Sequence, residues 1–128
     1  MRVYCLGNPY LKDDSRALEL CKQLTIPGFE FVQCYKWEHI EITIPLIVVD
    51  VVEGLEDVRL VDLSELQQTN TVTAHDFDLF QWLTLMKKLN MLDELIIIGI
   101  PKAGELKEAK EKLVKLLSRI TAQRKAIK

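Results

Sequence analysis

The sequence predicts an α/β domain with a mostly parallel, twisted sheet of about five strands and helices on both faces. Short apolar segments rich in β-branched residues alternate with segments whose apolar residues recur at helical spacing. This alternation is typical of parallel sheets that helices cover on both sides. The length of 128 residues, with 48% hydrophobic and 28% charged residues, is enough for one hydrophobic core and not for two. We therefore treat residues 1–128 as a single domain.

Strands are expected at residues 2–7, 29–35 and 44–52 in the first half of the chain. The last of these is largely apolar and β-branched, as in strands buried on both faces. An acidic pair followed by Ser15 is a good helix start between the first two strands. The apolar residues of that helix recur at helical spacing: Ala17, Leu20, Cys21 and Leu24.

The second half begins with a short strand candidate at 58–63 and a polar segment, 67–74, that we expect to be a loop. Asp76 is suited to cap the helix that follows. One face of that helix carries apolar residues: Leu79, Trp82, Leu83, Met86 and Leu89.

A further buried strand is predicted at 94–100 and ends before Pro101. The last helix is predicted from 105 to 119 or beyond, and the basic tail 124–128 is expected to fray. The inward-facing residues of that helix are Leu106, Ala109, Leu113, Leu116, Leu117 and Ile120.

Charge and hydropathy exclude several functional classes. The chain has 17 basic and 19 acidic residues, so it lacks the excess of positive charge that nucleic-acid binding requires. The longest apolar runs, 44–49 and 95–100, are six residues each, far below the ~20 that span a bilayer. The N-terminus has no apolar stretch long enough for a secretory signal. We expect a cytoplasmic protein without nucleic-acid or membrane partners.

The chain contains three cysteines, Cys5, Cys21 and Cys34. Their number is odd, their spacing is wide and no CxxC motif occurs, so neither a disulfide framework nor a zinc site is expected. Cys5 and Cys21 lie among apolar neighbours, and we expect both to be reduced, buried thiols of an intracellular protein.

Polar residues follow the predicted strands at the places where α/β sheets bind ligands. The first strand leads into residues 7–14, which end in Asp13 and Asp14, and Asp50 ends the central strand. His75 is expected in the loop before the helix that contains Trp82. Two carboxylates and one imidazole suit a borderline divalent ion such as nickel or zinc.

Other interpretations of these residues stay open at this stage. Asp13 or Asp14 would also serve as a helix cap, where a carboxylate favours the positive end of the dipole. Asp50 stands in an apolar run and requires a partner or a ligand, because burial of a lone charge is costly. Nucleotide-binding glycine motifs and a GxSxG nucleophile elbow are absent from the sequence. A nucleophilic Cys34 with His39 as base lacks an orienting third group.

The order of these motifs resembles that of the hydrogenase maturation proteases, the endopeptidases that trim the large subunit of nickel–iron hydrogenases. That family opens with a strand, Gly-Asn and an acidic pair, then has a central strand ending in Asp, a short strand, a His-containing segment before a helix, and a last strand that ends near Pro. The corresponding segments here are 6–14 (Leu-Gly-Asn-Pro-Tyr-Leu-Lys-Asp-Asp), 47–54, 58–62, 73–76 (Thr-Ala-His-Asp) and 96–101.

The resemblance implies a function and a site. In that family the second acid of the pair, the strand-end Asp and the His converge on nickel, which corresponds to Asp14, Asp50 and His75 here. It also implies that Gly7, Asn8 and Asp13 belong to the substrate-binding segment. The nickel comes with the substrate, a hydrogenase large-subunit precursor whose C-terminal peptide is removed, so the protein is expected to hold no tightly bound metal of its own. The catalytic residues are not identified.

Two segments depart from the family pattern. Ser15, Arg16 and Ala17 replace the small residues that usually follow the acidic pair, and 33–37 (Gln-Cys-Tyr-Lys-Trp) replaces a Gly-rich acidic turn. A non-cleaving factor of the same fold, which binds metal or precursor, is therefore an alternative. A third interpretation is an interaction domain whose acids only cap helices. Metal affinity separates the first two from the third, and substrate processing separates the first from the second.

Overall fold

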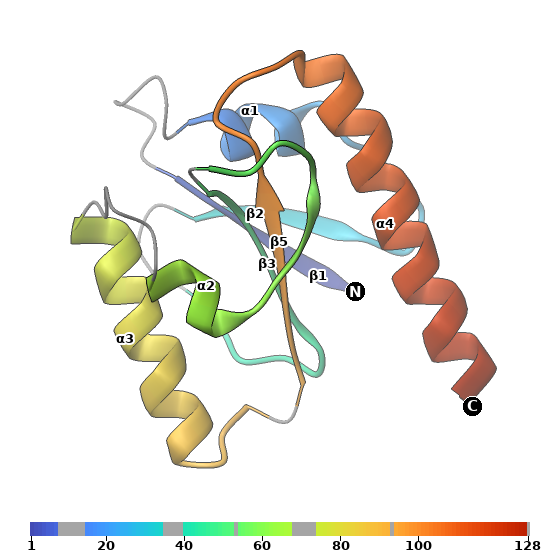
Figure 1. Cartoon of the computed structure of the whole chain (residues 1–128). Helices are drawn as coiled ribbons and strands as arrows, with labels where there is room; N and C mark the ends of the chain where they lie inside the picture. Colours follow the sequence, from blue (N-terminus) through green and yellow to red (C-terminus); the bar gives the residue numbers. More distant parts are fainter. Residues whose placement is uncertain (8–14, 35–39, 53, 68–73, 93, 128) are drawn as a thin grey trace.

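The fold was examined in a computed structural model that describes residues 1–7, 15–34, 40–52, 54–67, 74–92 and 94–127 (Figure 1). For 66–67, 74–80 and 125–127 the description covers the backbone only. The elements of the described residues are, in chain order, β1 (Arg2–Leu6), α1 (Arg16–Lys22), β2 (Glu30–Cys34), β3 (Leu46–Val51), β4 (Arg59–Val61), α2 (Leu63–Gln67), α3 (Ala74–Lys88), β5 (Leu95–Ile100) and α4 (Leu106–Ile127).

Five of these elements form one sheet in the order β2-β1-β3-β5-β4. The pairs β1–β2, β1–β3 and β3–β5 are parallel, and only β4 is antiparallel to its neighbour among the described strands. The central strands β1, β3 and β5 are the apolar ones, because both of their faces are covered. The predicted α/β fold with a mostly parallel sheet is confirmed.

One face of the sheet is covered by α1 and α4. Successive side chains of a strand point to opposite faces, so Val3 and Cys5 of β1 lie on this side together with Ile47 and Val49 of β3. They pack against the apolar sides of the two helices, and this packing confirms the helical spacing predicted for both. The buried helix residues are Ala17, Leu18, Leu20, Cys21, Ala109, Leu113, Leu117 and Ile120.

The opposite face of the sheet is covered by α2 and α3 (Figure 1). Its fully buried sheet residues alternate with those of the first face and include Tyr4, Leu6, Leu46 and Val48. Helix α3 packs on them through Leu83, which is fully buried, and through Trp82, which is half-buried; Leu63 of α2 also contacts this cluster. The two helix layers therefore place the sheet at the centre of the domain.

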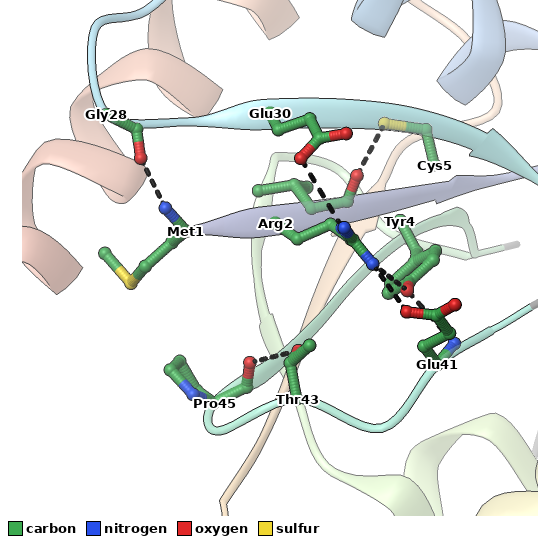
Figure 2. A network of polar contacts seen from close by, with 10 residues as sticks. Met1, Arg2, Tyr4, Cys5, Gly28, Glu30, Glu41, Thr43 and Pro45 are labelled. Carbon is green, nitrogen blue, oxygen red and sulfur yellow. Dashed lines mark hydrogen bonds and ion pairs between the residues drawn. The ribbon is translucent and has the colours of Figure 1, made fainter.

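Polar contacts fasten the start of β1, at the end of the sheet where the parallel strands begin (Figure 2). The guanidinium of Arg2 lies 3.0 Å from a carboxylate oxygen of Glu41 and 3.5 Å from one of Glu30. The Tyr4 hydroxyl accepts a hydrogen bond of 3.0 Å from the Glu41 backbone N–H. The N-terminal ammonium of Met1 donates to the Gly28 carbonyl. These contacts join β1 to the adjacent segments, far from the strand ends where ligands bind in such sheets.

Helix α2 differs from the prediction, which gave a strand at 58–63 followed by a loop. Strand β4 ends at Val61, and α2 begins at Leu63. The helix starts here because the Glu65 side chain caps the Asp62 N–H, and a backbone hydrogen bond between the same two residues closes the first turn. The Asp62 N–H donates to the Glu65 carboxylate at 3.2 Å, and the Glu65 N–H donates to the Asp62 carbonyl at 2.9 Å. Most of the predicted loop, 68–73, lies outside the described residues.

Two predictions about the helices were wrong, one about a buried face and one about a helix end. Leu89 was assigned to the inward face of the helix that contains Trp82, yet α3 ends at Lys88 and Leu89 is 56% exposed. The C-terminal tail was expected to fray from residue 124, but α4 continues to Ile127. The Arg124 guanidinium forms an ion pair with Glu94, the residue just before β5, and this contact holds the last turns of α4 against the sheet.

The expectation that Cys5 and Cys21 are reduced thiols was also wrong. Cys5 and Cys21 form a disulfide inside the core beneath α1, while Cys34 is a free, buried thiol. The two residues are 16 positions apart, but α1 crosses directly over β1 and brings their Cα atoms to 6.5 Å. That separation lies in the range that a disulfide spans without backbone movement. Sequence spacing does not reveal this contact, because it results from helix–sheet packing.

Candidate functional site

The candidate site lies at the carboxyl ends of the parallel strands. Gly7 directly follows β1 and is buried, and its N–H donates a hydrogen bond of 3.3 Å to the Cys34 carbonyl at the end of β2. Val52 directly follows β3, and its N–H donates to the Ile100 carbonyl at 3.0 Å. Hydrogen bonds thus join the carboxyl end of β1 to that of β2, and the carboxyl end of β3 to that of β5. Such an edge is where open α/β sheets place their ligands.

Asp50 is the central described residue of this site. It lies within β3, one residue before the strand ends, and is 1% exposed. Its Oδ1 accepts a hydrogen bond of 2.9 Å from the Val51 N–H, which fixes the orientation of the carboxylate. By the alternation of β3, its side chain shares the face of Val48, the face that α3 covers. An acid this deep in an apolar strand is costly to bury unless it has a partner or a ligand.

His75 belongs to the first turn of α3. The prediction that it lies in a loop was wrong. The helix begins at Ala74, two residues before the expected cap at Asp76. It begins at the end of the sheet where β5 finishes, and it runs back across the sheet toward the opposite end (Figure 1). His75 and Asp50 therefore belong to elements that meet on the same face and at the same end of the sheet.

The remaining site residues predicted from sequence are Asn8, Asp13 and Asp14, and all three lie outside the described residues. For His75 the backbone alone is described. Among the side chains that the structure describes, no group of three or more His, Cys, Asp or Glu residues is placed to hold a metal ion. The convergence of Asp14, Asp50 and His75 stays a prediction.

Gly99 is a site-forming residue that the sequence analysis missed. It pairs with Asp50 in the register of β3 and β5. A Cβ built on Gly99 would lie 2.5 Å from Leu55 Cδ1 and 2.6 Å from Val61 Cγ2. The missing side chain therefore lets β4 and the chain after β3 close over β5, beside Asp50. A glycine inside the β-branched run 95–100 is the signal that identifies such a close approach.

Replacement of Gly99 with Ala should destabilise the domain by about 1–3 kcal/mol, the usual cost of overpacking. Leu55 can rotate its terminal methyl away, but Val61 is branched at Cβ and has few rotamers to offer. Urea unfolding of the variant measures the loss. The Val61→Ala variant provides the control, since it removes the clashing methyl. The double variant should lose less stability than the sum of the losses of the two single variants. A loss equal to that sum would contradict the predicted clash.

A pocket on the other side of the sheet is distinct from this site. It lies between the turn before β4 and the start of α4, and acidic residues line much of it. Asp57 and Lys112 form an ion pair of 2.6 Å there, and the hydrogen bond from Lys112 lowers the pKa of the Asp57 carboxyl. The residues of α4 that line the pocket belong to the helix opposite α3, so the pocket does not open toward the Asp50 side chain.

The alternative nucleophile also finds no support in the geometry. Cys34 ends β2 and is 2% exposed, within the cluster beneath α3. A thiol in that position is not accessible to a peptide bond. His39, its suggested base, lies outside the described residues, as do Trp37 and most of the altered turn that begins at Gln33.

Comparison with known proteins identifies the fold. No protein-family model and no curated protein matches the sequence. The NiFe hydrogenase maturation protease HybD from Thermococcus kodakarensis is similar in structure, with a TM-score of 0.67 and 19% identity over 93% of this chain and 97% of that one. HybD from E. coli gives a TM-score of 0.67 with 15% identity, covering 92% of this chain and 91% of its own. A hydrogenase 3 maturation protease gives 0.62 with 20% identity, covering 89% and 86%. The predicted structural resemblance to this class of protease is confirmed.

Proposed function

We propose that this chain is an endopeptidase that recognises inserted nickel and removes the C-terminal peptide of a nickel–iron hydrogenase large-subunit precursor. The observation that carries the proposal is Asp50, a carboxylate buried in an apolar strand at the ligand-binding end of a fold shared with solved hydrogenase maturation proteases. A carboxylate at that position is suited to bind a cation that arrives with the substrate.

The proposed ligands of the substrate's nickel are Asp14, Asp50 and His75. Two carboxylates and one imidazole match the preference of a borderline divalent ion for mixed oxygen and nitrogen donors. Asp50 is held in one orientation by the Val51 N–H. His75, in the first turn of α3, stands on a helix whose packing through Leu83 fixes its direction over the same face. Gly7, Asn8 and Asp13 are proposed to contact the precursor beside the nickel.

Held by these side chains, the substrate's nickel would help to position the bond to be cleaved. Polarisation of the carbonyl and activation of a water are the two further roles open to such an ion. The chain itself contributes the binding, the rigid placement of the carboxylates and the exclusion of water by the apolar strands beneath them. We also propose that the reaction takes place in the cytoplasm without nucleic-acid or membrane partners. None of the described helices is long and apolar enough to cross a bilayer.

The purified protein is expected to hold well below one equivalent of nickel or zinc after dialysis, as measured by elemental analysis. Three ligands from separate segments leave open coordination positions, and an open site binds more weakly than a closed structural one. Added nickel, zinc or cadmium should still bind. Binding requires a neutral imidazole, so affinity should be full above the ordinary histidine pKa of ~6.5 and should fall as the pH drops below it. A stoichiometric metal that survives chelator treatment would contradict this expectation.

The proposal is tested by intact-mass spectrometry of a large-subunit precursor incubated with this protein. The nickel-loaded precursor should lose its C-terminal peptide, and the nickel-free precursor should stay intact. Binding of the loaded precursor without a change in mass would indicate the non-cleaving maturation factor instead. A precursor that is neither bound nor cut would overturn both functions.

A further inference from the structure

Arg59, the first residue of β4, lies in one lateral row of the sheet with Asp50. The register of the strands pairs Asp50 with Gly99 of β5, and Gly99 with Arg59. Because β4 is antiparallel to β5, its first residue lies at the end where the parallel strands finish. Arg59 alternates with Leu60 and therefore shares the face of Val61, which is buried in the cluster beneath α3. An arginine and the buried carboxylate thus occupy the same end and the same face of the sheet.

The separation of these two residues follows from the geometry of the sheet. Neighbouring strands lie ~4.8 Å apart, so the Cα atoms of Asp50 and Arg59 are about 10 Å apart. Gly99 between them has no side chain, and methyl groups of Leu55 and Val61 occupy the space where its Cβ would lie. An extended peptide rises ~3.3 Å per residue, so a peptide held at Asp50 reaches Arg59 within about three residues.

The Arg59 guanidinium is held in one orientation by contacts along one of its edges. Its Nη2 and Nη1 donate to the two carboxylate oxygens of Glu65, at 2.6 and 3.3 Å, and Nη1 also donates to the Leu60 carbonyl at 3.0 Å. The Glu65 carboxylate is fixed in turn, because it accepts the Asp62 N–H at the start of α2. The hydrogen bonds to Glu65 raise the pKa of Arg59, which therefore stays positively charged.

A second edge of the same guanidinium is available to a ligand. Besides the donors just described, a guanidinium has an Nε–H and a further Nη2–H, which point in parallel along that edge. Within the described part of the chain these two groups have no acceptor, and the Arg59 side chain is 50% exposed. Arg2 differs, because its Nε and its Nη1 both face glutamates, Glu30 and Glu41. Two parallel donors on Arg59 match the two oxygens of a carboxylate.

We infer that Arg59 binds a carboxylate of the precursor and is a specificity-determining residue, an inference that rests on the proposed function. The carboxylate is the free C-terminus of the peptide that is removed, or an Asp or Glu side chain of that peptide. Both sources offer the same two oxygens to the same edge of the guanidinium. Glu65 does not compete for this edge, because it is held by the other edge and by the Asp62 N–H. A contact that is equal before and during cleavage strengthens binding without changing the chemical step.

The experiment measures how the Arg59→Gln variant of the full chain cleaves the nickel-loaded precursor. KM should rise about tenfold with little change in kcat, because a charge-assisted bidentate contact is lost from the substrate and the transition state alike. The midpoint of urea unfolding should change little, since exposed ion pairs contribute little stability. The matched control Arg124→Gln removes the ion pair with Glu94 at the opposite end of the sheet and should keep the wild-type KM. An unchanged KM in Arg59→Gln would overturn the inference.

A second variant separates geometry from charge. Arg59→Lys keeps the positive charge but has no second pair of parallel donors, so its KM should also rise. A wild-type KM in Arg59→Lys would overturn the bidentate contact on which the inference depends.

Altered precursors identify the carboxylate that is bound. One precursor has an amidated C-terminus, and another has Asn and Gln in place of every Asp and Glu of the removed peptide. For the precursor that lacks the bound carboxylate, the wild-type chain should show the raised KM, and Arg59→Gln should raise it no further. An equal effect of Arg59→Gln on every precursor would overturn the inference.

Failure of the proposed function gives a different result. A wild-type chain that neither binds nor cuts the nickel-loaded precursor would overturn that function, together with the inference that rests on it. Binding without cleavage would overturn the endopeptidase activity alone, and the dissociation constant would then replace KM in every comparison.

Discussion

The His75→Ala variant is expected to lose nickel-dependent cleavage of the precursor by at least ~100-fold, because it removes one of three proposed ligands from an open site. The free energy of unfolding should change little. His75 lies in the first turn of α3, whereas the described core contacts of that helix are made by Trp82 and Leu83, two turns further on. Cleavage is followed by intact-mass spectrometry, and stability by urea unfolding.

The control for this variant is His39→Ala, which replaces the other histidine of the chain and should retain both cleavage and nickel affinity. The pH dependence provides a second measurement. Wild-type affinity for nickel should fall as the pH drops below ~6.5, whereas the His75→Ala variant should lack that inflection. Equal loss of cleavage in both variants, with the fold intact, would indicate a different site.

The strands and the layers of the fold were predictable because they depend on local patterns. Alternation along β1 and β3 decides which residues face α1 and α4 and which face α3, and the apolar run in β3 predicts a central strand. The helix α2 was missed, although its signal is local. Asp62 and Glu65 have the spacing of a capping box, but the polar residues that follow resemble a loop.

The site was predictable only in part, because some of its residues act through contacts between distant segments. Asp50 was identified because an acid in an apolar strand conflicts with its surroundings, and the structure confirms its burial. Gly99 was missed because its role arises from contacts between segments far apart in the sequence: it admits Leu55 and Val61. A glycine in a β-branched run indicates a close approach, but it does not tell which segments approach.

The disulfide is the clearest case of such a contact, and it leads to the second large expected effect. Reduction of the bond between Cys5 and Cys21 should lower the free energy of unfolding by about 3 kcal/mol, the value expected from chain entropy for two cysteines 16 positions apart. The bond acts mainly on the unfolded chain, whose freedom it restricts. Urea unfolding with and without a phosphine reductant measures the difference.

Two controls make the origin of that effect unambiguous. The Cys34→Ala variant should respond to the reductant as the wild type does, because Cys34 is a free thiol. The Cys5→Ala/Cys21→Ala variant should not respond to it at all. Alkylation of the unfolded, unreduced protein should add one adduct, on Cys34, whereas three adducts would show that the disulfide is absent.

Disulfides are rare in the cytosol outside hyperthermophiles, so the same alkylation on freshly lysed cells also tests the proposed cytoplasmic location. A reduced pair in the cell, with oxidation only after lysis, would fit an ordinary cytosol, whereas an oxidised pair would require either a hyperthermophilic cytosol or an oxidising compartment.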